Sequence, residues 1–201
     1  MTQLSKMEGL LTRQFFDDGL LDMFVGVGLA LIGIAWLSGL VALGAIVPAV
    51  MMPFWKPLRQ KLTEPHIGTV DFSASHKKKG KEALTKWVAF GIVVLVVEVS
   101  ALFAFNRVSL SSLDFLKDLV PALPSVLIAI PLTATALYLK IGRFALYGTL
   151  SVFFGFILLV DTGINLEPGH AILFTGVCTA LIGFGVFRHF LQNAHEMDAE
   201  G

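Results

Sequence analysis

The chain has 201 residues, of which 55% are hydrophobic and only 15% are charged, and its formal net charge is zero. Soluble globular domains carry about 25% charged residues, so the composition excludes an ordinary soluble domain and indicates lipid as the main solvent. The charge balance argues against a generally basic nucleic-acid-binding protein. The single cysteine, Cys178, excludes an intramolecular disulfide.

The first eighteen residues are polar enough to stay outside the bilayer. Ser5 and Glu8 have the spacing of a capping box, and apolar residues recur behind them at helical intervals. The pattern predicts a short amphipathic helix on the cytoplasmic surface of the membrane. A cytosolic extension of the first span is the alternative.

Five long apolar runs follow, and their lengths set the number of membrane crossings. The first, between Asp22 and Lys56, has 33 residues, which is too many for one crossing because a bilayer core needs about 20 helical residues. A reversal at Ser38-Gly39 divides this run into two short spans, and the other four runs, of 17 to 21 residues, cross once each. We therefore predict an all-α polytopic membrane protein, a bundle of six transmembrane helices. A five-span protein with a re-entrant first run is the alternative.

Lysine and arginine are distributed unevenly between the two sides of this bundle. Thirteen of the fifteen fall on one side, and only Arg107 and Lys117 fall on the other. Because basic loops are retained in the cytoplasm, we predict that both termini are cytoplasmic and that the protein is a multi-pass protein of the cytoplasmic (plasma) membrane. The predicted parts are an amphipathic cytoplasmic or interfacial segment (1–18), a transmembrane helical hairpin of two spans (19–55), a basic cytoplasmic loop (56–86), a four-span transmembrane bundle (87–190) and a cytoplasmic tail (191–201).

The basic loop begins after the prolines predicted to end the second span, Pro53 and Pro57. It carries a cluster of lysines suited to anionic lipid headgroups: Lys77, Lys78, Lys79 and Lys81. Determination of topology alone would also account for this cluster.

One acidic residue, Glu98, is predicted near the centre of the bilayer, twelve positions after Lys86. A carboxyl group at this depth costs at least about 2.5–3.5 kcal/mol, so it should face other helices or a wet cavity. Ser151, Thr175 and Thr179 fall at a similar depth and are predicted to help it bind a small cation or a proton. The alternative is a protonated strut that joins helices by hydrogen bonds.

Acidic residues also stand at the ends of predicted spans. Asp18 and Asp22 are one turn apart at the start of the first span, where the helix dipole stabilises carboxylates. Asp161 ends the fifth span. These residues are predicted either to cap and solvate the helix ends or to form a gate or vestibule of a pathway.

Two segments of the chain resemble one another. Residues 24–33 and 174–183 are identical at seven of ten positions. Inverted repeats occur in transporters, but a three-plus-three duplication would pair the first span with the fourth, not with the sixth. We interpret the match as a coincidence between segments rich in Gly, Ala and Leu.

The chain contains no motif for catalysis, for a cofactor or for a metal site, so we predict none of these and disfavour an enzyme. Our leading hypothesis is a channel or transporter for a small cation or a proton-coupled solute. The alternative is a non-catalytic membrane interaction module that binds anionic lipid or a partner protein through the basic loop. Small size and glycine-rich helix faces predict a homo-oligomer.

Overall fold

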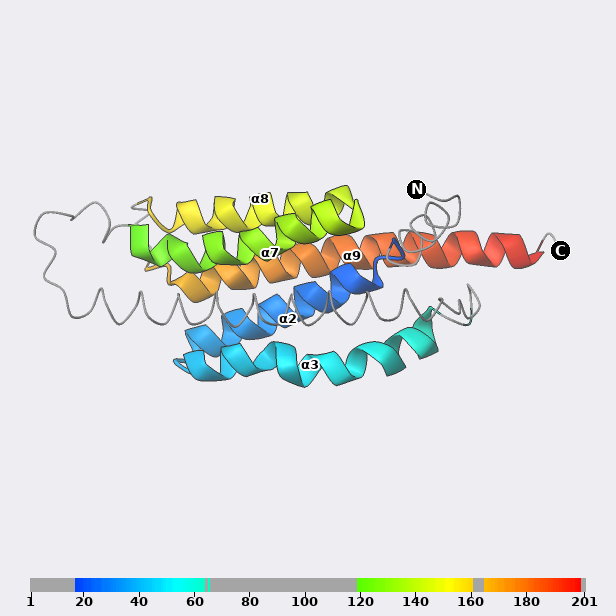
Figure 1. The fold of residues 1–201 in the computed structure, drawn as a ribbon, viewed down its shortest axis with the longest axis horizontal. Helices are drawn as coiled ribbons and strands as arrows, with labels where there is room; N and C mark the ends of the chain where they lie inside the picture. The colour runs from blue at the N-terminus through cyan, green and yellow to red at the C-terminus, as the bar shows by residue number, and fades with distance from the viewer. Residues whose placement is uncertain (1–16, 64, 66–118, 161–164, 200–201) are drawn as a thin grey trace, which may run out of the picture.

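The computed structural model describes residues 17–63, 65, 119–160 and 165–199, with side chains as far as residue 193. All regular elements in this part of the chain are helical, in agreement with the predicted fold class (Figure 1). In chain order they are α2 (Leu20–Leu37), α3 (Val41–Leu62), the short 3-10 helix η1 (Val120–Ala122), α7 (Leu123–Leu139), α8 (Gly142–Ile157) and α9 (Pro168–Ala199).

The reversal predicted at Ser38-Gly39 joins α2 to α3. Ser38 closes α2 by donating from its backbone N–H and its hydroxyl to the carbonyl of Ile34. Gly39 has φ +74°, in the left-handed region that favours glycine. The first apolar run therefore forms two antiparallel helices.

α3 is longer than the sequence analysis predicts. It continues through Pro48, Pro53 and Pro57 and ends at Leu62. Each proline removes one backbone donor, and a long apolar helix tolerates the loss where the freed carbonyl finds another partner. As a result, α3 extends beyond Lys56 and brings its last basic residues back to the start of α2.

The helices alternate in direction, so their ends gather at two ends of the bundle (Figure 1). The start of α2, the end of α3 and the turn between α7 and α8 lie at one end, linked by ion pairs from Asp18 to Arg59 and from Asp22 to Arg143. We call this the charged end. Gly169, at the start of α9, packs against Leu37 at the opposite end.

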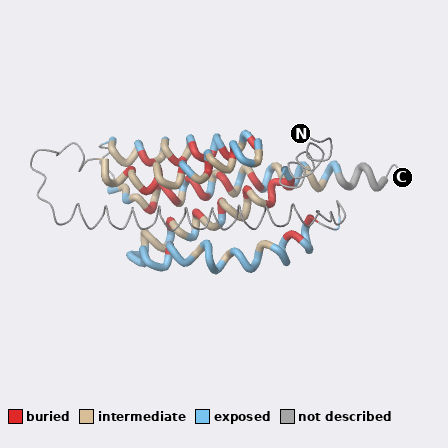
Figure 2. The backbone as a smooth tube through the Cα atoms, in the orientation of Figure 1, coloured by how far each residue is buried: buried red, intermediate tan, exposed pale blue. Residues whose placement is uncertain are grey.

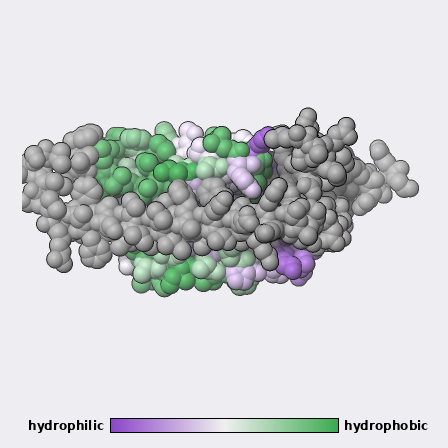
Figure 3. All heavy atoms as spheres, viewed as in Figure 1, coloured by the Kyte–Doolittle hydropathy of each residue, from purple (hydrophilic) through white to green (hydrophobic). Residues whose placement is uncertain are grey.

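Four of these helices are long and apolar enough to cross a membrane, and α8 is a shorter apolar helix. α3 has few buried residues, as Figure 2 shows, and large apolar side chains such as Ile46 and Phe54 lie on its surface. On the face shown in Figure 3, the hydrophilic residues gather towards the charged end. These surfaces suit a membrane-embedded protein.

α2 and α9 form the most closely packed helix pair in the described part of the chain. A Cβ added at Gly33 would lie 2.6 Å from the backbone nitrogen of Leu173, and one added at Gly183 would lie 2.5 Å from that of Met23. The backbones touch directly because glycine leaves no side chain between them. The glycines of this contact recur every seven residues on both helices: Gly19, Gly26 and Gly33 on α2, and Gly169, Gly176 and Gly183 on α9.

The internal sequence match lies in this contact. In the aligned segments, Gly26 corresponds to Gly176 and Ala30 corresponds to Ala180. The contacts between the helices are reciprocal, since Gly26 packs against Ala180 and Gly176 packs against Ala30. The two segments are therefore related by an approximate two-fold axis. Coincidence of composition does not account for this reciprocity, so we revise that interpretation.

The core beside this pair is built mainly from α7 and α8. Gly148 and Gly155 on α8 bring it close to α7, where added Cβ atoms would meet Thr133 and Ser125 respectively. The buried apolar cluster joins α2, α7, α8 and α9: Leu29, Leu132, Ala136, Ile141, Phe144, Tyr147 and Ile172.

We expect Gly176→Ala to destabilise the protein by about 1–3 kcal/mol, the usual cost of overpacking. Its methyl group would meet the backbone of Ala30, which cannot rotate away. The free energy of unfolding in mixed micelles is the measurement. Gly185→Ala on the same helix is the control, because nothing lies within 4 Å of its added Cβ. Equal stabilities of the two variants would contradict the close contact.

Candidate functional site: a buried ionic cluster

Five ionisable residues from three helices meet at the charged end, and we call them the ionic cluster: Asp17, Asp18, Asp22, Arg59 and Arg143. Gly19, with φ +79°, turns the chain into α2 so that the acids on either side of it reach the bundle. The late end of α3 contributes Arg59, and the first turn of α8 contributes Arg143. The cluster therefore joins the start of α2 to α3, the next helix in the chain, and to α8, which is distant in sequence.

Asp22 is paired with Arg143. Its Oδ2 atom accepts a hydrogen bond of 2.9 Å from the guanidinium Nε, and its side chain is 0% exposed. Arg143 is 25% exposed, and its Nη1 also donates to Asp17 at 2.8 Å. One guanidinium thus connects a fully buried carboxylate with one at the surface.

Asp18 has two separate roles. Its Oδ1 accepts a hydrogen bond of 3.1 Å from the N–H of Leu20, which caps the start of α2. Its Oδ2 lies 3.8 Å from Nη2 of Arg59, an ion pair without a short hydrogen bond. The capping interpretation of the sequence pattern fits Asp18, whereas the pairing of Asp22 with Arg143 goes beyond capping.

Burial raises the pKa of Asp18 above its ordinary value of 3.8, because desolvation penalises the carboxylate. The positive charge of Arg59 and the hydrogen bond from Leu20 act in the opposite direction but are smaller. Asp18 therefore holds its proton to higher pH in the folded protein than in the unfolded chain.

Several buried oxygens of this region have no hydrogen-bond partner among the described residues: Asp18 Oδ2, Asp22 Oδ1, Thr63 Oγ1 and Tyr147 Oη. The Thr63 hydroxyl nevertheless lies close enough to Asp18, and the Tyr147 hydroxyl to Asp22, for each pair to interact. Such oxygens are costly to bury. They are ready acceptors for a proton or another small hydrogen-bond donor.

The described residues of the cluster include more acidic than basic groups. Three carboxylates face two guanidinium groups within the described residues. The same residues contain no group of three His, Cys, Asp or Glu side chains that could hold a metal ion.

The structure places the hydroxyl residues predicted from the sequence inside the bundle. Thr175 and Thr179 are both 0% exposed on α9. Thr175 donates to the carbonyl of Ala171 in its own helix, and Ser151 donates to the carbonyl of Ser125 on α7, each at 2.8 Å. Thr179 Oγ1 has no hydrogen-bond partner among the described residues. The other predicted site residues lie outside the described residues: Glu98, Asp161, Lys77, Lys78, Lys79 and Lys81.

Sequence reasoning missed Arg59, Arg143, Tyr147 and Thr63. The two arginines were counted only as markers of the cytoplasmic side. One signal was available for Arg143, because it precedes Tyr147 by one helical turn and stands at the start of a span, as the aspartates do. Nothing in a single sequence pairs it with an acid 121 positions away.

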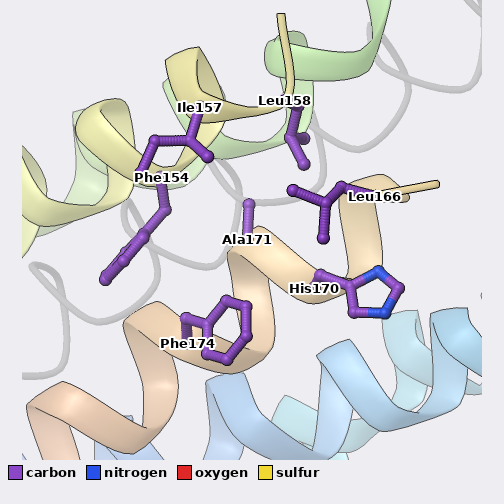
Figure 4. Close-up of a pocket in the computed structure, with 7 residues that line it drawn as sticks. All are labelled: Phe154, Ile157, Leu158, Leu166, His170, Ala171 and Phe174. Atoms are coloured by element: carbon purple, nitrogen blue, oxygen red, sulfur yellow. The ribbon is translucent and has the colours of Figure 1, made fainter. Parts of the chain in front are cut away.

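A second feature lies at the opposite end of the bundle. A cavity of about 180 Å³ opens between α8 and the start of α9, as Figure 4 shows, and its lining is almost wholly apolar: Phe154, Ile157, Leu158, Leu166, His170, Ala171 and Phe174. The polar side chain in this lining is that of His170. Its Nδ1 atom accepts a hydrogen bond of 3.0 Å from the N–H of Glu167, and this contact caps the start of α9. The cavity offers no chemistry comparable with that of the ionic cluster.

Comparison of the chain with models of known protein families, with curated proteins and with solved structures found no match.

We expect Arg143→Gln to destabilise the protein strongly, because it leaves Asp22 buried without its guanidinium partner. Breaking a buried pair in this way costs about 3–5 kcal/mol. A double-mutant cycle with Asp22→Asn measures the coupling, and the double variant should lose less than the sum of the single losses. Arg188→Gln, at an exposed position on α9, is the control. Additive losses would contradict a direct pair.

Because the pKa of Asp18 is raised in the folded protein, the free energy of unfolding should depend on pH in a definite direction. Between 3.8 and the higher folded-state pKa, the folded protein binds more protons than the unfolded chain, so stability falls as pH rises through this window. Relative to Asp18→Asn, which cannot ionise, the parent should lose stability as pH rises above 3.8. Unfolding free energies measured across pH for both proteins test this. The opposite slope would show that attraction to Arg59 outweighs desolvation.

Proposed function

We propose that the protein is an integral membrane protein that passes a proton, another small cation or a proton-coupled solute across the bilayer. The helices supply the apolar frame, since four of them are long and apolar enough to span a membrane. The ionic cluster at the charged end is the gate of the pathway, with Asp18 and Asp22 as its acids.

The observation that carries this proposal is the carboxylate of Asp22. It is 0% exposed, and its Oδ1 has no hydrogen-bond partner among the described residues. Ionisable groups inside membrane bundles are costly, and they mark ion and proton pathways. A carboxylate that served only to hold helices together would have all of its hydrogen bonds satisfied. An oxygen without a hydrogen-bond partner is suited instead to receive a cation or a proton.

The remaining elements of the proposal rest on the sequence. The positive-inside distribution of Lys and Arg sets the charged end in the cytoplasm, in a six-span protein of the cytoplasmic membrane. Glu98, predicted at mid-membrane, would be the next acid along the route, with Ser151, Thr175 and Thr179 around it. Asp161 would stand at the outer mouth. Assembly as a homo-oligomer belongs to the same proposal.

The test is flux through the purified protein in proteoliposomes, measured for H⁺, Na⁺ and K⁺ under an imposed potential. We expect the parent to carry at least one of these cations. Asp22→Asn should lower that flux at least tenfold, because the neutral amide cannot take up positive charge. Asp22→Asn keeps the shape of the side chain but weakens the pair with Arg143, so its flux is compared with the parent only for protein that elutes as the folded assembly in size exclusion.

Glu167→Gln is the matched control, because it removes an exposed carboxyl at the opposite end of the bundle. Its flux should equal that of the parent. The proposal is contradicted if the parent protein passes none of the three cations. It is also contradicted if the Asp22→Asn variant passes them at the rate of the parent.

A further inference from the structure

We propose that Asp22 Oδ1 is a proton-binding site and that Tyr147 passes this proton to a row of buried hydroxyls running through the bundle. The inference rests on the proposed function and names its substrate as the proton. Two independent observations support it: the unpartnered oxygens at the charged end, and hydroxyl groups buried behind them.

The groups that face Asp22 are few among the described residues. α8 contributes Arg143, bound to Oδ2, and Tyr147, whose hydroxyl faces the carboxylate. Asp18 lies one turn earlier on the same chain segment and is itself paired with Arg59 of α3. α9 lies close to Asp22 as well, since a Cβ added at Gly183 would lie 2.8 Å from the Cβ of Asp22. Among these groups, Tyr147 carries the hydroxyl that can exchange a proton with the carboxyl group of Asp22.

The hydroxyl row follows from the register of α8 and α9. Arg143, Tyr147 and Ser151 stand at intervals of four residues, so they share one face of α8. Thr179 lies one turn from Gly183, which is level with Asp22, so it lies about 6 Å further into the bundle. Every hydroxyl-bearing side chain of this row is at most 1% exposed: Tyr147, Thr179, Ser151, Thr175 and Ser125.

The row reaches far along the bundle. Ser151 donates to the carbonyl of Ser125, which belongs to the first turn of α7 and lies beneath Gly155. Over the eight residues from Arg143 to Ser151, α8 rises about 12 Å. Three hydroxyl oxygens of the row have no hydrogen-bond partner among the described residues: Tyr147 Oη, Thr179 Oγ1 and Ser125 Oγ. Unpartnered hydroxyls are free to turn, as a proton relay requires.

The transfer balances without any further reactant. In the ionised state the Tyr147 O–H points to Asp22 Oδ1. A proton arriving from the charged end forms an Oδ1–H bond, while Oδ2 keeps its hydrogen bond from Arg143. Tyr147 then turns its O–H towards the next hydroxyl. As the Oδ1–H bond breaks, a new O–H bond forms at Tyr147 Oη, and the tyrosine releases its former proton along the row. No charge remains on the phenol.

The proton on Asp22 is detected by infrared difference spectra of the protein in nanodiscs, taken between high and low pH. We expect the C=O band of a protonated carboxyl to appear as pH falls and to be missing in Asp22→Asn. Tyr147→Phe should shift this band, because it removes the facing hydroxyl. Tyr138→Phe, an exposed tyrosine on α7, should leave it in place. A band that persists in Asp22→Asn, or that does not shift in Tyr147→Phe, overturns the proposed proton-binding site.

The row is tested by proton flux in proteoliposomes. Thr179→Val keeps the shape of the side chain but loses the hydroxyl, and it should lower flux at least fivefold, whereas Thr179→Ser should keep it. Thr149→Val, which removes an exposed hydroxyl on α8, is the control. Undiminished flux in Thr179→Val overturns the row. If the infrared result holds but the parent passes no cation, the proposed transport fails while the proton-binding site stands.

Discussion

The direct contact between the backbones of α2 and α9 is the constraint on which the rest of this structure depends. Glycine at every seventh position lets the two helices approach until no side chain separates them. Because Gly183 lies against the Cβ and the backbone of Asp22, α9 covers this residue closely on one side. A larger residue there would push the helices apart and let water reach the acid. The packing of glycines thus creates the low dielectric in which the charged groups act.

Charge then joins α3 and α8 to this pair. Arg143 connects α8 to Asp22, and Arg59 connects α3 to Asp18. α3 contacts the bundle mainly through α2 and buries few of its residues, so its attachment at the charged end depends largely on polar groups. Buried ion pairs contribute little net stability when desolvation is counted. Removal of one partner is costly all the same, because it leaves the other charge buried and unpaired.

Local patterns predicted the helical class, the reversal at Ser38-Gly39 and the polar start of α2, because each depends on neighbouring residues. The course of α3 through Pro53 and Pro57 was not predicted, since tolerance of proline depends on packing and surroundings that sequence does not show. The pairing of Arg143 with Asp22 also escaped prediction, because it joins residues 121 positions apart. The repeat between the first and last described helices was visible in sequence, but only its reciprocal contacts gave it a physical meaning.

The approximate two-fold axis has one consequence for polarity. The half-turn that exchanges α2 and α9 carries Asp22 onto Ile172, which is equally buried but apolar. The two ends of this helix pair therefore differ in the chemistry of the side chain at one equivalent, buried position. The shared backbone contact places both side chains in the interior, so a single residue at each end, an aspartate or an isoleucine, decides which end of the pair carries a buried charge.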